Sequence, residues 1–408
     1  MRQSLLWNAA YTQLAVQTLA WTWESTVRPG PLRTWGTWLS LAGFAYLSTY
    51  LPPGGAWLHE EWHRAVLARR GAGSRNGVYD LDIGASVIAV DHVADADLAR
   101  LKADHPEDFV RLMSAGIEAE TEAHRQMRLH NFLLDRSSEH DRLLWWPGAL
   151  NSAAYLFICA TGSEDKSFRA MEGRESDPED RDFTGPDFTA WVYDLRRPEE
   201  DYAAGPRGRP HPSGTDGYRR YLVSSDLTSG ERRYLGLQAA LSLFNLSSPQ
   251  FWGVDHMPGR VPWDGRAVRW NGGLSHYLTP YGFSLGADLW VRRGKWSWAL
   301  AARAYANADM ALPGLKAQLL RYPWRPTWAG GIPLRLTAGA AAWLQPGDLR
   351  FHDHDVVPGG SLLAGVSVPI RGSLEAWAEA DAKSAGWVAG NVHLDPAVQA
   401  RAGLALRL

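Results

Sequence analysis

The spacing of apolar residues divides this chain into a helical first part and an alternating last part. Up to about residue 160, apolar side chains recur at helical spacing, notably in segments 5–26, 35–51 and 145–159. Pro106 opens a long helix that is predicted from Glu107 to about Leu134, because acidic residues begin it and arginines lie toward its end. We expect segment 35–51 to be a buried core helix or a re-entrant segment, and segment 145–159 to be a buried helix.

From about residue 267, apolar and polar residues alternate between short turns, which is typical of antiparallel strands. About eight such segments of roughly ten residues each follow one another. One of them sets the apolar residues Phe283, Leu285, Ala287, Leu289 and Val291 against Ser284, Gly286, Asp288 and Arg292. The pattern predicts an α+β fold, with a helical domain over 1–160, an irregular and helical connecting region over 161–266, and a β-domain over 267–408.

This alternating part resembles the outer-membrane β-barrel proteins over roughly the last third of the chain, down to a terminal strand from Val398 to Leu408. The resemblance implies an antiparallel barrel of about eight strands, embedded in membrane lipid, and a location in the outer membrane. A soluble barrel or sandwich with one wet face is the alternative. The 21 Trp and 14 Tyr residues fit a protein that meets a membrane interface or binds sugars.

The connecting region contains one clear helix signal and one aromatic segment. Thr228 and Glu231 have capping-box spacing at the start of a predicted helix that runs to Asn245. The aromatic segment from Phe183 to Tyr193 lies within a stretch rich in charge, glycine and proline. We expect it to be ordered, as a lid or a docking loop.

Charge and cysteine content narrow the choice of partners. The net charge is −2, from 42 basic and 44 acidic residues, which gives no electrostatic case for nucleic-acid binding. The single cysteine, Cys159, excludes an internal disulfide and a Cys-x-x-Cys metal site.

The most specific motif is His-Glu-x-x-His, formed by His59, Glu60 and His63. It follows the break at Pro52-Pro53-Gly54-Gly55 and precedes Gly71, so a helix is expected across it. His59 and His63 then share one helix face and can bind one Zn²⁺, while Glu60 reaches a water molecule at the metal. The alternative is a surface helix with solvated charges, but apolar residues on both sides of the motif favour a buried helix.

This motif resembles that of the gluzincin metallopeptidases, in which His-Glu-x-x-His is paired with a glutamate on a later helix. The resemblance covers two helices and implies a zinc-dependent hydrolase of peptide or protein substrates, with Glu60 as general base. It also implies a third zinc ligand on the 106–134 helix, and Glu118 is the predicted one. Glu120, Glu122 and His124 are the alternatives.

Several roles and two other functions stay open. The residue that would stabilise the transition state is one of Tyr79, His92 and Tyr193. His352 and His354 lie in a predicted polar hairpin loop, where short histidine tracts bind metal only when pre-arranged. The alternative functions are a non-enzymatic outer-membrane channel or adhesin, with the helical domain as plug or cap, and a metal-dependent lipid hydrolase.

Overall fold

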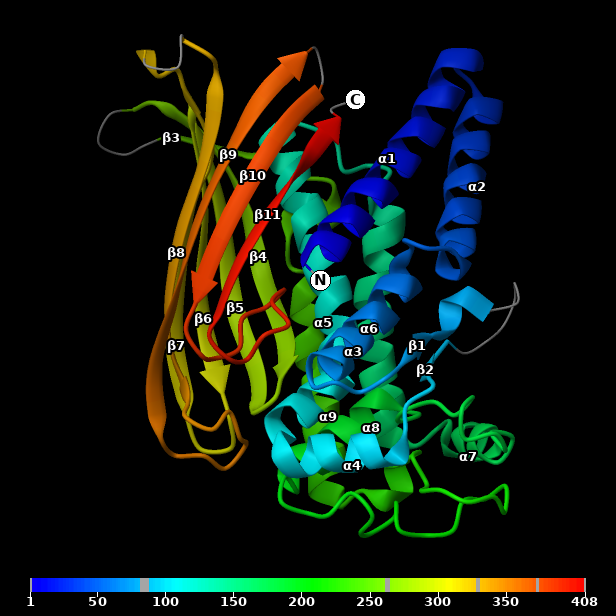
Figure 1. Ribbon diagram of the computed structural model, residues 1–408. Coiled ribbons are helices and arrows are strands. Elements are labelled where there is room, and N and C mark those ends of the chain that lie inside the picture. Colours follow the sequence, from blue (N-terminus) through cyan, green and yellow to red (C-terminus); the bar gives the residue numbers. More distant parts are fainter. Residues whose placement is uncertain (1, 81–87, 261–264, 328–330, 372–373, 407–408) are drawn as a thin grey trace.

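The chain forms a body of helices that stands beside one large antiparallel sheet, which makes it an α+β protein (Figure 1). This computed structural model describes residues 2–80, 88–260, 265–327, 331–371 and 374–406. The helices come first along the chain and the sheet occupies its last part, as the change of periodicity near residue 267 predicts.

The helices of the described part are α1 (Arg2–Thr26), α2 (Pro31–Leu47), α3 (Gly55–Arg69), α4 (Asp95–Asp104), α5 (Pro106–Leu134), α6 (Arg142–Thr161), α7 (Asp165–Glu172), α8 (Asp187–Arg196) and α9 (Ser229–Ser242). Short 3₁₀ turns lie between some of them: η1 (Ser48–Tyr50), η2 (Gly77–Asp80), η3 (Ser224–Asp226), η4 (Leu243–Leu246) and η5 (Pro249–Trp252). The predicted helices are confirmed, with ends that differ by a few residues.

Two helices begin where local sequence signals place them. Pro106 is the first residue of α5, a position where the missing N–H costs no hydrogen bond. At α9, the N–H of Glu231 donates to Thr228 Oγ1 at 3.3 Å, and the N–H of Thr228 donates to the Glu231 carboxylate at 2.7 Å. This reciprocal pair is the predicted capping box, so local chemistry alone explains the start of α9.

Within the described residues, the large sheet is a simple meander of nine antiparallel strands, in which each strand pairs with its neighbours in sequence. Its strands are β3 (Met257–Arg260), β4 (Ala267–Thr279), β5 (Gly282–Arg293), β6 (Trp296–Ala306), β7 (Ala311–Trp324), β8 (Leu334–Pro346), β9 (Val356–Arg371), β10 (Leu374–Lys383) and β11 (Ala397–Leu406). A separate two-stranded sheet joins β1 (Arg75–Asn76) and β2 (Val90–Asp91). The predicted terminal strand is thus β11, and residues 407–408 lie outside the described part.

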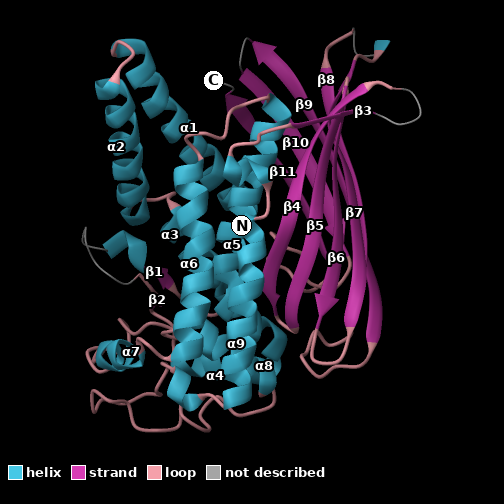
Figure 2. Ribbon diagram, turned by 180° about the vertical axis from the view of Figure 1, so that it is seen from behind, coloured by secondary structure: helices cyan, strands magenta, loops and turns pink. Residues whose placement is uncertain are grey.

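The prediction of a closed barrel is corrected to an open sheet. Within the described ranges, the first and last strands, β3 and β11, each pair on one side only. The physical reason is that a helix occupies the inner side: α5 runs along the inner face and packs against β4 and β5 (Figure 2). Phe132 of α5, for example, is buried with Trp290 and Leu320 of the sheet. Side chains of α5 therefore fill the space on the inner side of the sheet, while the described residues of β3 and β11 do not pair with each other.

The two faces of the sheet have opposite polarity, as the alternation predicts. On the outer face, Leu289 of β5 lies opposite Leu300 of β6, and both side chains are exposed. On the inner face, the next residues include Asp288, whose carboxylate accepts a hydrogen bond from Arg303 at 3.0 Å. Arg125 of α5 lies 3.9 Å from the same carboxylate. The charged side of the sheet is therefore turned toward the helices, and the apolar side is turned away from the protein.

Two helices that the sequence predicts as buried expose one face. Thr37 and Leu41 are the only fully buried side chains among the described residues of α2. In α6, Trp145 and Leu156 are buried, whereas Phe157 on the other face is exposed. These two helices thus contain more apolar residues than the protein core buries.

Candidate metal site

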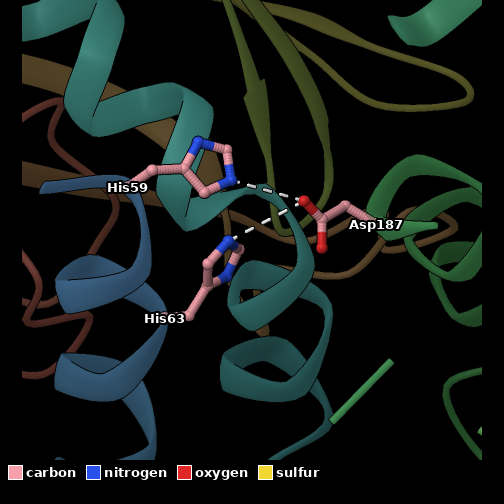
Figure 3. A group of neighbouring side chains, drawn as sticks. All are labelled: His59, His63 and Asp187. Carbon is pink, nitrogen blue, oxygen red and sulfur yellow. Dashed lines mark hydrogen bonds and ion pairs between the residues drawn. The ribbon is translucent and has the colours of Figure 1, made fainter. Parts of the chain in front are cut away.

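The His-Glu-x-x-His motif lies on α3, in the middle of the helical body. Gly54 precedes the helix, and no side chain caps it, so its position is set by packing of the buried Trp62 and Leu67. The rings of His59 and His63 lie on the same side of α3, with their centroids 4.9 Å apart (Figure 3). The predicted helix and the shared face of the two histidines are thus present.

Asp187, the first residue of α8, completes a group of three possible ligands (Figure 3). Its Oδ2 lies 3.5 Å from Nε2 of His59 and 3.8 Å from Nε2 of His63. The three donor atoms all lie within 4.8 Å of one another. Ligands bound about 2.0–2.1 Å from a tetrahedral zinc ion are separated by roughly 3.3 Å, so the three atoms would have to move slightly closer together to hold the metal.

The outward nitrogen of each imidazole has its own partner. His59 Nδ1 lies 2.8 Å from Glu120 Oε1, and His63 Nδ1 lies 2.6 Å from the carbonyl oxygen of Leu112. A neutral histidine that donates from Nδ1 to such acceptors presents an unprotonated Nε2, which is the form that binds a metal. Both acceptors belong to α5, so the contact between α3 and α5 orients both rings.

The structure does not bring Glu118 to the histidines. Its carboxylate accepts hydrogen bonds from Arg111 at 2.9 and 3.0 Å, and from Trp387 Nε1 and the N–H of Gly390, each at 3.0 Å. Glu118 is therefore committed to a buried ion pair on the side of α5 that faces the β10–β11 connection. In its place, Asp187 stands beside the two histidines.

The alternative ligands on α5 also lie away from the Nε2 atoms of His59 and His63. Glu122 accepts two hydrogen bonds from Arg125, each at 2.7 Å. His124 lies against Gly148 of α6, where its ring leaves no room for a Cβ. Glu120 does contact the site, but at Nδ1 of His59, as the partner that orients the ring. Its geometry suits an outer hydrogen-bond acceptor.

Asp187 was missed because no local pattern connects it to the motif, from which it is 128 residues away as counted from His59. The available signal was its position: Gly185-Pro186-Asp187 opens the aromatic segment that the sequence predicts to be ordered. The N–H of Asp187 donates to the hydroxyl of Tyr155 on α6 at 2.9 Å, which fixes the start of α8. The predicted lid or docking loop is thus a helix whose first residue faces the histidines.

Glu60 borders a cavity of about 120 Å³ next to the histidines. Polar groups and apolar side chains both line this cavity: His59, Glu60, Ile88, Tyr155, Phe168, Met171, Asp182, Phe183, Gly185 and Asp187. Glu60 itself is buried, and its carboxylate has no hydrogen-bond partner within the described part of the chain. A small molecule or a segment of substrate in this cavity would meet the glutamate together with His59 and Asp187.

Burial and neighbouring charges perturb the ionisation of the site. Burial raises the pKa of Glu60 to about 8, and the nearby carboxylates of Asp187 and Glu120 add to this effect. Burial lowers the pKa of His63 to about 4, which keeps its ring neutral at pH 7. Burial would also lower the pKa of His59, but its hydrogen bonds to Asp187 and Glu120 raise this pKa well above the ordinary value. Without a metal, His59 therefore holds a proton between two carboxylates.

The side chains proposed as transition-state stabilisers lie elsewhere. Tyr79 accepts a hydrogen bond from Trp57, His92 contacts Asp91, and Tyr193 donates to Glu200. Tyr155 is the tyrosine that borders the cavity. Because its oxygen accepts the bond from Asp187, its own proton remains available for donation.

A second histidine group is more open to solvent. His352 and His354 each lie 3.9 Å from Asp309 Oδ2, and both rings are exposed. The loop is a connection between β8 and β9, as predicted. It has neither the burial nor the outer hydrogen bonds that orient the rings of the α3 site.

Comparison of the chain with protein-family models, curated proteins and solved structures finds no match.

Proposed function

We propose that this protein is a membrane-associated, zinc-dependent hydrolase whose metal is held by His59, His63 and Asp187. The observation that carries the proposal is the convergence of three donor atoms from α3 and α8, with both remaining ring nitrogens held by α5. Two imidazoles and one carboxylate are a donor set that zinc uses in catalytic sites. A zinc ion bound there lowers the pKa of a water molecule and polarises a substrate carbonyl group.

Glu60 is the proposed general base. It adjoins His59 in sequence and borders the cavity, so it would be the carboxylate next to a water molecule bound to the metal. In the metal-free protein burial raises the pKa of Glu60 to about 8, so this carboxyl is protonated at neutral pH. A zinc ion beside it would favour the carboxylate form, which is the form that accepts a proton. Tyr155 is the proposed donor to the oxygen that becomes negatively charged during attack.

A peptide is the leading substrate class, and a lipid ester or amide is the second. Ile88, Phe168, Met171 and Phe183 line one part of the cavity and suit an apolar substituent beside the reacting carbonyl group. The lipid alternative is favoured by the exposed apolar face of the sheet, which would bring the protein to a membrane that contains such substrates. Parallel panels of peptide and lipid substrates separate the two classes.

The proposed membrane association concerns the outer face of the sheet. Leu315, Leu362 and Leu404 lie on three different strands and are among its most exposed side chains, with Leu362 at 69%. Charged residues such as Lys316 of β7 and Glu379 of β10 occupy the alternate, inward positions of their strands. Apolar residues outside and charged residues inside are the arrangement expected for strands that face lipid. An outer-membrane location is the corresponding proposal for the protein in the cell.

A non-enzymatic channel is less favoured. The space between α5 and the inner face of the sheet is divided into cavities of about 50 and 60 Å³. These volumes accommodate a few water molecules and offer no wide path for a solute.

Metal analysis and hydrolysis assays on purified protein test the proposal. His59→Ala should lose bound zinc, whereas Glu60→Gln should retain zinc and lose hydrolysis. Glu61→Gln is a matched control, because Glu61 pairs with Arg64 and does not border the cavity. Full activity of Glu60→Gln, or absence of bound zinc from the wild-type protein after incubation with zinc, would contradict the proposal.

A further inference from the structure

Helix α1 turns several polar side chains toward the protein, beside the buried Leu5 and Val16, and leaves large apolar side chains exposed. Its polar residues Asn8, Thr12 and Gln13 face the protein, and Gln13 is only 3% exposed. Apolar residues on the other side, including Leu14 and Trp21, are exposed, Trp21 to 66%. In water, this orientation forfeits the burial of the apolar side chains, which is the main stabilising contribution of an amphipathic helix.

The buried polar groups of α1 are satisfied inside the protein. Gln13 Nε2 donates to the carbonyl oxygen of Met127 at 3.1 Å and to Asn131 Oδ1 at 3.0 Å. Asn8 Nδ2 donates to the carbonyl oxygen of Pro53. Hydrogen bonds from polar side chains between helices are the usual means by which helices associate in lipid. The inward polar side therefore attaches α1 to α5 and leaves its apolar side outward.

Helix α2 pairs with α1 and exposes a similar apolar side. Leu39 is 68% exposed, and Trp35 is exposed to a comparable degree. The two helices meet closely where the Trp23 ring lies against Gly36, and Trp23 Nε1 donates to Ser40 Oγ at 2.9 Å. A small residue at such a crossing is typical of helix pairs in membranes.

Helices α1 and α2 form a hairpin, and its charged residues are confined to its ends. Residues 3–23 and 34–59 contain no Asp, Glu, Lys or Arg, whereas Glu24, Arg28 and Arg33 gather at the turn between the helices. At 1.5 Å per residue, the 25 residues of α1 extend about 38 Å and the 17 residues of α2 about 26 Å, close to the roughly 30 Å of a bilayer's hydrocarbon core. A bilayer would accommodate this uncharged length and place the charged turn among headgroups.

Apolar surfaces on two sides of the molecule distinguish a bilayer from a protein partner. The hairpin and the outer face of the sheet lie on opposite sides of α5 (Figures 1 and 2). Next to the hairpin, α6 is long and apolar enough to cross a membrane, and 28% of its apolar stretch is buried. One protein partner would cover one of these sides, whereas lipid surrounds both.

We propose that α1 and α2 insert as a hairpin into a lipid bilayer, so that helices, together with the open sheet, form the lipid-facing surface of the protein. This inference goes beyond the proposed function, because it concerns the helical side and does not depend on the metal.

Single-cysteine labelling of the full chain tests the hairpin. In a Cys159→Ser background, cysteine replaces Leu14, Leu39 or, as a control from the polar end, Asp216, which is exposed. Each variant carries an environment-sensitive fluorophore and is reconstituted into vesicles of phosphatidylethanolamine and phosphatidylglycerol, with or without nitroxide on the acyl chains. We expect blue-shifted emission and at least threefold stronger nitroxide quenching at Leu14 and Leu39 than at Asp216.

A fourth label at Leu315 reports on the sheet separately. Quenching at Leu315 without quenching at Leu14 and Leu39 would overturn the hairpin proposal and leave the membrane contact of the sheet intact. Blue-shifted emission at Leu14 and Leu39 that nitroxide does not quench would also overturn it, since a protein surface would then cover the hairpin. Zinc content and hydrolysis of the same samples show whether the proposed function stands or falls independently.

Discussion

The sharpest test of the site compares Glu118→Gln with Asp187→Asn, because the two changes should act on different properties. Arg111 is fully buried and donates to both oxygens of Glu118. A glutamine has one acceptor oxygen and no charge, so Arg111 would remain buried without its counter-ion. Breaking a buried pair in this way costs about 3–5 kcal/mol. Since Glu118 does not contact the histidines, zinc affinity should be unchanged.

Asp187→Asn should have the opposite profile. The substitution keeps the shape of the side chain and the backbone hydrogen bond to Tyr155, but removes the negative charge next to both Nε2 atoms. Changes to outer partners of metal ligands weaken binding by about 10–100-fold. Loss of the ligand charge itself should exceed that range, which corresponds to more than about 1.4–2.7 kcal/mol.

Two measurements on each variant decide the matter. Competition with a chromogenic chelator gives zinc affinity, and thermal or denaturant unfolding of metal-free protein gives stability. The reasoning is refuted if Glu118→Gln weakens zinc binding as strongly as Asp187→Asn while the stability of the metal-free protein stays at the wild-type level. That outcome would return Glu118 to the role of third ligand.

Three further predictions concern the same site. Glu120→Gln should weaken zinc binding by about 10–100-fold because it releases His59 Nδ1, and an unchanged affinity in the chelator assay would contradict this role. Zinc must displace the proton of His59, whose pKa is raised, so zinc affinity should rise about tenfold per pH unit below that pKa. A zinc affinity that stays constant in calorimetry across pH 5–8 would rule this out. The pKa of Glu60 rises from 4.5 to about 8, so the folded state binds this proton more tightly and its stability falls as pH increases through that window. Between pH 4 and pH 9, the free energy of unfolding of metal-free Glu60→Gln should therefore increase, relative to that of the wild type, by on the order of 4 kcal/mol. An equal difference between the two proteins at both pH values would count against a buried, unpaired carboxyl at this position.

The secondary structure follows largely from local sequence. Pro106 and the Thr228 capping box mark helix starts without any help from the rest of the chain. The alternation after residue 267 predicts the strands β4 to β11 and their two-faced character, because successive side chains of a strand point to opposite sides. Closure of the sheet, in contrast, does not follow from local sequence. An open and a closed sheet have the same alternation within each strand, and they differ only in whether the first and last strands pair.

The histidine pair belongs to what the sequence by itself determined, because a four-residue spacing on one helix brings His59 and His63 to one face whatever surrounds them. Which acidic residue stands beside the two histidines was decided by tertiary structure. Each residue turns an α-helix by about 100°, so Glu118 and Glu120 point to different sides of α5, and the packing of that helix selects which one meets α3. Asp187 reaches the site only because α8 docks beside α3, a contact across 128 residues that no local pattern encodes.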